Sequence, residues 1–337
     1  MKIRVGLIGA GRMGNVYANT LAYTVSEVEL AAVAEPNDIC LQETLDKFGI
    51  SKGYKDYRNL LDDKNIDAVV ISTPTNTHVQ IIKDAALAGK NIFSEKPLSQ
   101  NIKECDEAIA IVKKTGVKLQ LGFMRRFDAP YVMAKTKIME GLIGKPVMFK
   151  AVSRDPKRTS LEFARRDNSG GLIVDMGVHD FDLARWLMDS EVERVYSEGA
   201  CIAFPELKEV GDIDNVVVNL RFTSGAIGNI DMSRNAVYGY DIRTEVLGTE
   251  GSLWIGYLQQ TAMLMLNRQG VTHDTVPYFM ERFGLAYAEE IRAFVRHMVE
   301  GTAPTVSGED ARAATAISIA ATLSLDEQRP VNVSEVL

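Results

Sequence analysis

Short apolar, β-branched runs alternate with helical patterns over the first 122 residues of the chain. The runs that predict strands are Ile3–Ile8, Leu30–Ala34, Ala68–Ser72, Asn91–Ser94 and Val117–Leu121. Apolar residues at helical spacing lie between them, over Met13–Val25, around Leu41, Leu45 and Phe48, and over His78–Ala88 and Ile102–Thr115. Strands that are apolar throughout and separated by helices are typical of a parallel sheet covered on both faces. The pattern predicts an α/β, doubly wound domain over residues 1–122.

The pattern changes after Gly122. Helical spacing predicts helices over Tyr131–Glu140, Asp175–Trp186 and Leu285–Glu300, the last closing the domain. Strand-like runs follow one another with turn signals between them, at Val147–Val152, Val192–Ala203, Asn215–Phe222, Ala226–Ser233, Ile242–Leu247, Ser252–Trp254 and Ala262–Leu266. Strands without intervening helices favour antiparallel pairing. Residues 123–337 are therefore expected to form an α+β domain with a large, mostly antiparallel open sheet.

Composition excludes several classes of partner. The net charge of −7, from 38 basic and 45 acidic side chains, argues against nucleic acid and anionic membranes. No apolar stretch reaches the ~20 residues that span a bilayer. Cys40, Cys105 and Cys201 are odd in number and widely spaced, which disfavours a disulfide framework or a metal site. We expect a protein of the reducing cytoplasm.

A glycine motif follows the first predicted strand and opens the first predicted helix. Gly9-Ala10-Gly11-Arg12-Met13-Gly14 has the spacing of a dinucleotide-binding turn. In such a turn the first glycine permits the bend, the second admits a pyrophosphate, and the third lets helix and strand pack closely. The alternative is an ordinary strand–turn–helix with incidental glycines. We favour the dinucleotide interpretation because of the strand–helix context.

An acidic residue ends the second predicted strand. Glu35 can hydrogen-bond both hydroxyls of an adenosine ribose, and its charge would repel a 2′-phosphate. NAD is therefore expected in preference to NADP. Arg12 could attract such a phosphate, and Glu35 could instead be a solvated residue before Pro36, so both alternatives stay open.

Two further segments follow predicted strands, at the sheet edge where such folds bind ligands. The first is Thr73-Pro74-Thr75-Asn76-Thr77-His78, in which His78 is expected to contact the cofactor or enter a helix rather than catalyse. The second is Glu95-Lys96-Pro97. Pro97 restricts the backbone of Lys96, which would help to hold an ammonium group near a nicotinamide. A role as an exposed loop lysine is the alternative.

A carboxylate and an imidazole lie four residues apart in the second half of the chain. Asp175 and His179 follow Ser169-Gly170-Gly171 at the start of a predicted helix, so both would project from one face. A carboxylate there can orient the imidazole for acid–base work. A capping aspartate beside a packed histidine is the alternative, and Asp180 and Asp182 compete as partners.

These motifs, in this order, resemble the glucose–fructose oxidoreductase, inositol dehydrogenase and rhizopine-catabolism (Gfo/Idh/MocA) superfamily over almost the whole chain. The segments closest to its inositol 2-dehydrogenase subgroup are Gly122–Asp128, Ser153–Pro156, Ser169–Asp182, Gly211–Asp214 and Ser233–Asp241. The resemblance implies a Rossmann domain that binds NAD, a substrate domain, and a homotetramer assembled through the open sheet. It also implies hydride transfer from a ring hydroxyl of a small cyclic polyol, myo-inositol, which yields the ketone scyllo-inosose.

The resemblance assigns roles to individual residues. His179 would be the general base oriented by Asp175, and Lys96 would stabilise the reacting oxygen, although the roles of Lys96 and His179 could be exchanged. The expected cofactor contacts are Gly9, Ala10, Gly11, Arg12, Met13, Glu35, Thr73, Pro74, Thr75, Asn76, His78, Glu95, Lys96 and Arg125. The expected substrate contacts are Lys96, Met124, Arg126, Asp155, Asp175, His179, Tyr238 and Tyr240. Core or surface roles stay open for Met124, Arg125, Arg126, Asp155, Tyr238 and Tyr240.

One segment departs from the subgroup. Lys157-Arg158-Thr159-Ser160 stands where inositol dehydrogenases of this type often carry a proline-rich stretch, which leaves the inositol isomer open. The alternatives are a scyllo-inositol or glucose-type aldose dehydrogenase of the same superfamily, and a non-catalytic, NAD-sensing regulator. Retention of Lys96, Asp175 and His179 in a chain with four histidines argues against the regulator.

Overall fold

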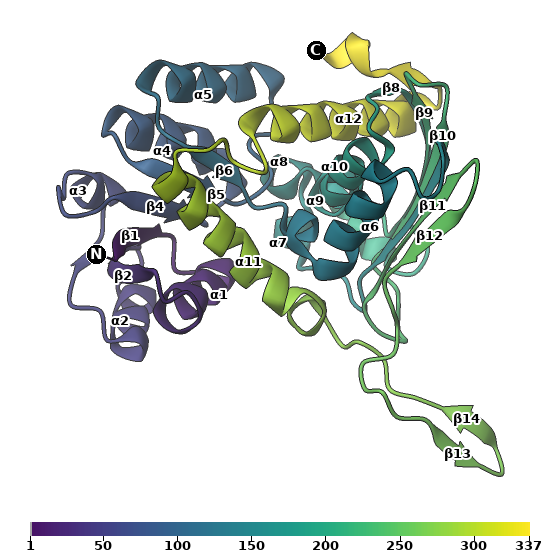
Figure 1. The fold of residues 1–337 in the computed structure, drawn as a ribbon, viewed down its shortest axis with the longest axis horizontal. Helices are drawn as coiled ribbons and strands as arrows, with labels where there is room; N and C mark the ends of the chain where they lie inside the picture. Colours follow the sequence, from purple (N-terminus) through teal and green to yellow (C-terminus); the bar gives the residue numbers. More distant parts are fainter. Residues whose placement is uncertain (1) are drawn as a thin grey trace. The chain divides into compact units, whose positions relative to one another are not determined.

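The computed structural model describes residues 2–337, which form two compact units (Figure 1). The first unit contains the chain up to Phe127 together with Leu285–Thr315. The second contains Asp128–Gly284 and Ala316–Leu337. Each unit is built from segments that are distant in sequence.

The first unit is built on a six-stranded sheet in the order β3-β2-β1-β4-β5-β6, in which every pairing is parallel. The strands are β1 (Ile3–Ile8), β2 (Val28–Ala34), β3 (Gly53–Tyr54), β4 (Ala68–Ile71), β5 (Asn91–Ser94) and β6 (Leu119–Leu121). The helices between them are α1 (Arg12–Asn19), α2 (Asp38–Phe48), α3 (Tyr57–Leu61), α4 (Thr75–Leu87) and α5 (Ile102–Thr115), and a π-helical turn, Thr20–Thr24, extends α1. The strand order reverses between β1 and β4, where doubly wound folds bind their ligands. The predicted doubly wound domain is confirmed.

Local sequence explains where these elements begin and end. The side chain of Asn37 accepts from the Cys40 N–H at the start of α2, and that of Asn101 accepts from the Lys103 and Glu104 N–H groups at the start of α5. Both helices end at glycines in the left-handed conformation. The two short elements β3 and α3 were not predicted, because they span too few residues to show a period.

The C-terminal part of the chain returns to complete the first unit. Helix α11 (Phe279–Glu300) belongs to this unit from Leu285 onward, as does the start of α12 (Gly308–Glu327). The Leu121 N–H donates to the Val306 carbonyl over 3.2 Å, and the rings of Phe93 and Phe294 pack edge to face. A single division at Gly122 is therefore incomplete, since pairing and packing join residues 285–315 to the N-terminal sheet.

The second unit is built on a seven-stranded sheet in the order β12-β11-β7-β10-β9-β8-β15. Its strands are β7 (Pro146–Arg154), β8 (Val192–Ala200), β9 (Asn215–Phe222), β10 (Ile227–Ser233), β11 (Asp241–Gly248), β12 (Ser252–Ile255) and β15 (Val331–Asn332). Only the β7–β10 pairing among these is parallel, so the predicted mostly antiparallel sheet is confirmed. Its helices are α6 (Ala129–Met139), α7 (Leu161–Ala164), α8 (Arg166–Ser169), α9 (Gly171–Asp175) and α10 (Gly177–Met188), with the end of α12.

Two sequence predictions for this region were wrong, and a third, the helical stretch at Asp175, is confirmed with a finer division. The run Ala262–Leu266 does not join the large sheet, because β13 (Met265–Asn267) pairs with β14 (Gly270–Thr272) in a separate exposed ribbon (Figure 1). The predicted helix Asp175–Trp186 is two helices, α9 and α10, with a turn at Met176. Helix α11 is not the last, since α12 follows it; the buried positions of α12 are largely alanine and serine, which give a weak apolar pattern.

Within residues 2–337, no helix is both long enough and apolar enough to cross a membrane.

Candidate functional site

The turn between β1 and α1 is shaped by three glycines. Gly9 has φ +92°, and a Cβ there would lie 2.9 Å from the Ser72 backbone. A Cβ on Gly14 would lie 2.1 Å from the Gly9 carbonyl oxygen, so only glycine permits this helix to pack so close to the strand. A Cβ on Gly11 would meet nothing within 4 Å. The fold therefore requires glycine at positions 9 and 14, whereas at position 11 a side chain would only fill open space beside the turn.

The N-terminus of α1 faces that open space. Gly11 is the N-cap residue, and no side chain among the described residues caps the helix. Arg12 and Met13 form its first turn, in which backbone N–H groups lack intrahelical partners. Unsatisfied N–H groups and the positive end of the helix dipole favour an anion such as a pyrophosphate. The turn fits the dinucleotide that the motif predicts.

Glu35 lies beside the glycine turn, immediately after β2. Its Oε2 accepts from the Ala10 N–H over 2.9 Å, and its Oε1 accepts from the Asn37 N–H over 3.0 Å. These two bonds fix a half-buried carboxylate at the edge of the open space. An ionised carboxylate has lone pairs for further donors, so Glu35 can still accept from ribose hydroxyls.

The segment after β4 joins the same edge of the sheet. Pro74 is the N-cap of α4, and Thr75 and Asn76 form its first turn. His78 is buried, and its ring nitrogens lie 2.9 Å from the Thr73 and Pro97 carbonyl oxygens. Burial lowers the pKa of His78. His78 therefore ties the Thr73 segment to the segment that carries Lys96.

Glu95 fixes the backbone of Lys96. Its buried carboxylate accepts from the Lys96 N–H over 3.0 Å through Oε2, and Tyr17 Oη lies 2.7 Å from Oε1. Burial raises the pKa of Glu95, and the positive charge of Lys96 opposes that shift. The side chain of Lys96 is half-buried. The carboxylate thus holds the lysine backbone at the end of β5.

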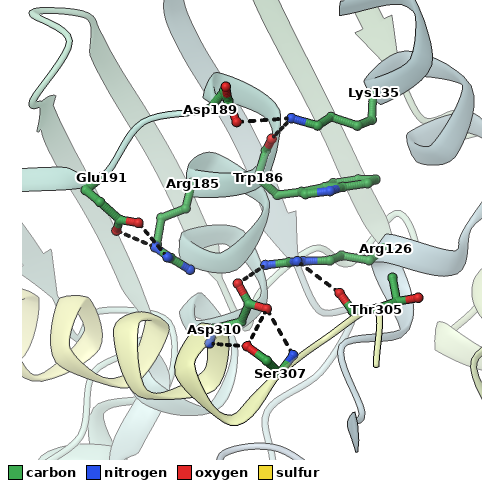
Figure 2. Close-up of polar contacts among 9 residues, drawn as sticks. All are labelled: Arg126, Lys135, Arg185, Trp186, Asp189, Glu191, Thr305, Ser307 and Asp310. Atoms are coloured by element: carbon green, nitrogen blue, oxygen red, sulfur yellow. Dashed lines mark hydrogen bonds and ion pairs between the residues drawn. The ribbon is translucent and has the colours of Figure 1, made fainter. Parts of the chain in front are cut away.

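Met124, Arg125 and Arg126 form a buried 3₁₀ turn, Met124–Phe127, shortly after β6. The Arg126 Nη2 donates to the Asp310 Oδ1 over 3.0 Å (Figure 2). The other Asp310 oxygen accepts from the Ser307 N–H and hydroxyl. Arg126, predicted to contact substrate, thus makes a half-buried ion pair that ties this turn to the start of α12.

A buried arginine that the sequence analysis did not single out holds the carboxylate of Asp175 in the second unit. Arg234, only 1% exposed, donates to the Asp175 Oδ2 over 3.3 Å and lies 4.0 Å from the Asp212 Oδ2. Burial raises the pKa of Asp212, whose other oxygen accepts from the Leu172 N–H. The sequence signal for Arg234 was its position within Ser233–Asp241, one of the segments that resemble the subgroup named in the sequence analysis.

His179 lies in the first turn of α10 and is buried. Asp175 ends α9, and Met176 between the two helices keeps a right-handed helical conformation, so the four-residue spacing spans helical backbone. At the other end of α10, Lys135 donates to the Trp186 carbonyl and pairs with Asp189 (Figure 2). A cation at this end favours the helix. Asp180 and Asp182 are buried as well.

The remaining predicted substrate residues lie near the ends of β7, β10 and β11. The backbone of Asp155 bonds to those of Ser233 and Ala236. The Tyr240 ring is buried against the Tyr278 and Phe283 rings.

Tyr238 is exposed, and its hydroxyl donates to Asp241 and accepts from Arg154. It therefore belongs to an ion network at the strand ends. Nowhere in residues 2–337 do three or more His, Cys, Asp or Glu side chains gather in a way that could hold a metal ion.

Two family models match the chain. Residues 3–123 match the oxidoreductase family with an NAD-binding Rossmann fold, GFO/IDH/MocA. Residues 131–254 match the GFO/IDH/MocA C-terminal domain. The turn that carries Met124, Arg125 and Arg126 lies between the two matched ranges.

Named relatives resemble the chain from end to end. The myo-inositol 2-dehydrogenase of Thermotoga maritima is 40% identical over 99% of this chain and 100% of its own length. The scyllo-inositol 2-dehydrogenase (NAD(+)) of Bacillus subtilis is 39% identical over 98% and 96%. A crystal structure of scyllo-inositol dehydrogenase from Lactobacillus casei, with bound NAD(H) and scyllo-inositol, superposes with a TM-score of 0.95 at 30% identity, covering 99% of this chain and 100% of that one.

The different surroundings of Gly11 and Gly14 generate a prediction. Gly11→Ala adds a methyl group to open space, so the thermal midpoint should stay within about 2 °C of wild type. The same methyl group should weaken NAD⁺ binding about tenfold or more, because it occupies the approach of the pyrophosphate. Calorimetric titration and thermal unfolding measure the two effects.

Gly14→Ala is the matched control. Its methyl group overlaps the Gly9 carbonyl, so it should destabilise the fold by about 1–3 kcal/mol. Wild-type affinity for NAD⁺ in Gly11→Ala would contradict the assignment of this turn.

Proposed function

The chain belongs to the GFO/IDH/MocA oxidoreductase family, and from this premise we propose that it is an NAD-dependent inositol 2-dehydrogenase that oxidises myo-inositol to scyllo-inosose. The observation that carries the proposal is the open turn at Gly11 beside the fixed carboxylate of Glu35, in a chain matching relatives of this name end to end. The family model supports NAD as the cofactor.

The first unit offers the groups that would hold the cofactor. The N–H groups at the start of α1, around Gly11 and Arg12, would bind the pyrophosphate. Glu35 would accept from the ribose hydroxyls, and its charge would disfavour a 2′-phosphate. When bound, NAD⁺ supplies the acceptor for the hydride that leaves the substrate carbon.

His179 would take the proton of the reacting hydroxyl, and Asp175 would orient it. Lys96 would donate to the same oxygen and stabilise the charge that develops there. The contact of the buried Arg234 with Asp175 supports a fixed carboxylate in this role. The reverse assignment, with Lys96 as the base, is the alternative.

The remaining hydroxyls of the ring need polar partners of their own. We propose Asp155 and Tyr240 for these contacts, with Met124 and Arg125 beside the cofactor. Arg126 and Tyr238 are weaker candidates, because Asp310 already binds one and Asp241 the other. Scyllo-inositol is the second candidate substrate, favoured by the name of the Bacillus subtilis relative at 39% identity.

The proposed activity predicts the outcome of a substrate panel. Purified protein with NAD⁺ should form NADH with myo-inositol, with kcat/KM higher than for scyllo-inositol or glucose. NADP⁺ should give at least about tenfold lower kcat/KM, because Glu35 repels the 2′-phosphate. The near-ultraviolet absorbance of the reduced cofactor measures the rate for each substrate and for each of the two cofactors.

No reduction with any polyol or sugar would contradict the enzyme and favour an NAD-sensing protein. A preference for scyllo-inositol would support the second candidate, and activity with NADP⁺ alone would contradict the role of Glu35.

The roles of His179 and Lys96 predict large effects on turnover. His179→Ala should lower kcat about 10²-fold or more, because it removes the general base. Lys96→Met should lower kcat by about 10²–10³-fold, as expected for a lost donor to developing oxyanion charge. Steady-state kinetics on the preferred polyol measure both.

His273→Ala is the control, since His273 is exposed near the β13–β14 ribbon. It should retain wild-type kcat. Near-normal turnover in His179→Ala would remove the proposed base.

We also propose a homotetramer assembled through the large sheet. Strand register puts Val217, Ile227, Leu247 and Trp254 on one face of the sheet, where they are exposed, Trp254 by 82%. Burial of such a face against another copy is favourable. Light scattering should give about four chain masses, and Trp254→Glu should lower the mass. A monomer at every concentration would contradict this assembly.

Cys40, Cys105 and Cys201 are free thiols, which supports our further proposal of a reducing, cytoplasmic location. Fractionation of the source cells would test it.

A further inference from the structure

Two glutamates share one tyrosine hydroxyl inside the first unit. Tyr17 Oη lies 2.7 Å from Glu95 Oε1 and 2.9 Å from Glu290 Oε1. Tyr17 comes from α1, Glu290 from α11, and Glu95 from the end of β5. Tyr17 and Glu290 are 0% exposed, and Glu95 is 8% exposed. Three ionisable groups thus meet where water does not reach them.

The number of hydrogens limits the charge of this cluster. Tyr17 has one hydroxyl hydrogen, so it can donate to only one of the two carboxyl groups. The other short contact needs a second hydrogen, which must come from a carboxyl group. Two carboxylates this close cannot both stay ionised in a buried site. One glutamate therefore carries a proton.

The surroundings of the two carboxyl groups assign that proton to Glu290. Glu95 accepts from the Lys96 N–H and faces the positive charges of Lys96 and Arg12. Glu290 faces Glu95 and Tyr17, and its Oε2 has no hydrogen-bond partner in the part of the chain that the structure describes. Burial and the charge of Glu95 raise the pKa of Glu290 well above its ordinary value.

Burial and the negative charge of Glu95 also raise the pKa of Tyr17, with a smaller effect of Tyr287. The hydroxyl therefore stays a donor. With the proton on Glu290, its carboxyl donates to the Tyr17 oxygen, and the Tyr17 hydrogen points to Glu95.

We propose that Tyr17 and Glu290 are positioning residues for Lys96. They act together by directing the hydroxyl hydrogen of Tyr17 onto Glu95. Glu95 then remains an anion that holds the Lys96 N–H and faces the lysine ammonium. This role rests on the proposed function, in which Lys96 donates to the reacting oxygen. Neither Tyr17 nor Glu290 touches the substrate; both act through Glu95.

The location of the proton has a direct test. Glu290→Gln removes the acid but keeps an N–H donor for Tyr17. The infrared spectrum of the wild type should contain a protonated-carboxyl C=O band that Glu290→Gln lacks. Glu289→Gln, next to it on the exposed side of α11, is the control and should keep the band. Persistence of the band in Glu290→Gln would overturn the assignment. This measurement needs neither cofactor nor substrate, so it is independent of the substrate panel.

The effect on Lys96 is tested by the pH dependence of kcat. Tyr17→Phe keeps a ring to pack against Phe93 and Tyr287 but removes the donor to Glu95. In the wild type, protonation of the general base His179 contributes to the acid limb of the profile. Loss of the Tyr17 hydrogen bond raises the pKa of Glu95, so protonation of Glu95 should reach into this limb and move it up by about one pH unit. KM for NAD⁺ should stay within about threefold, because cofactor binding does not need this hydrogen.

Glu290→Gln should give the wild-type profile, because its amide still donates to Tyr17. Tyr23→Phe, at an exposed position, controls for the loss of a tyrosine hydroxyl. A Tyr17→Phe profile that superimposes on wild type would overturn the positioning role. A shift in Glu290→Gln as large as that in Tyr17→Phe would show that Glu290 acts as an anion, which would also overturn the proposal.

Discussion

The closeness of α1 to β1 is the constraint on which the first unit depends. A single methyl group on Gly14 would reach within 2.1 Å of the Gly9 carbonyl oxygen, so the helix starts directly at the end of the strand. That contact leaves the first-turn N–H groups of α1 uncovered and brings Ala10 within hydrogen-bond distance of Glu35. The same placement carries Tyr17 inward to Glu95. The proposed cofactor site and the proposed support of Lys96 thus share one geometric cause.

Buried charge fixes the candidate residues in both units. Arg126 meets Asp310, Arg234 meets Asp175, and Glu95 accepts from the Lys96 backbone. Taking two charges out of water costs about as much free energy as their pairing returns. These contacts are therefore weak sources of stability. Their benefit is a single side-chain geometry. An enzyme that needs a lysine and a histidine in defined positions gains from that rigidity.

The sequence predicted what depends on neighbours along the chain. Strands β1, β5 and β9 and helix α5 have the predicted bounds, because apolar periodicity and local caps determine them. The glycine turn and Glu35 were singled out by motif spacing, and their contacts with the cofactor stay a prediction. Arg234 and Glu290 were missed because the partner of each lies far away in the sequence. The type of a single residue does not identify such a partner. Helix α12 was missed because small residues fill its buried side. The proposed catalytic pairing of Lys96 with His179 stays a prediction.

The composition of the first unit from two chain segments has a consequence for synthesis. Tyr17 and Glu290 are 273 residues apart, and Val306 bonds to the last strand of the N-terminal sheet. A ribosome delivers residues in order at about 5–20 per second, so the N-terminal sheet waits tens of seconds for α11. During that time Glu95 and the inner face of α1 lack their final cover. A chain that stops before α11 therefore leaves Tyr17 without the carboxyl group of Glu290 and Leu121 without the carbonyl of Val306.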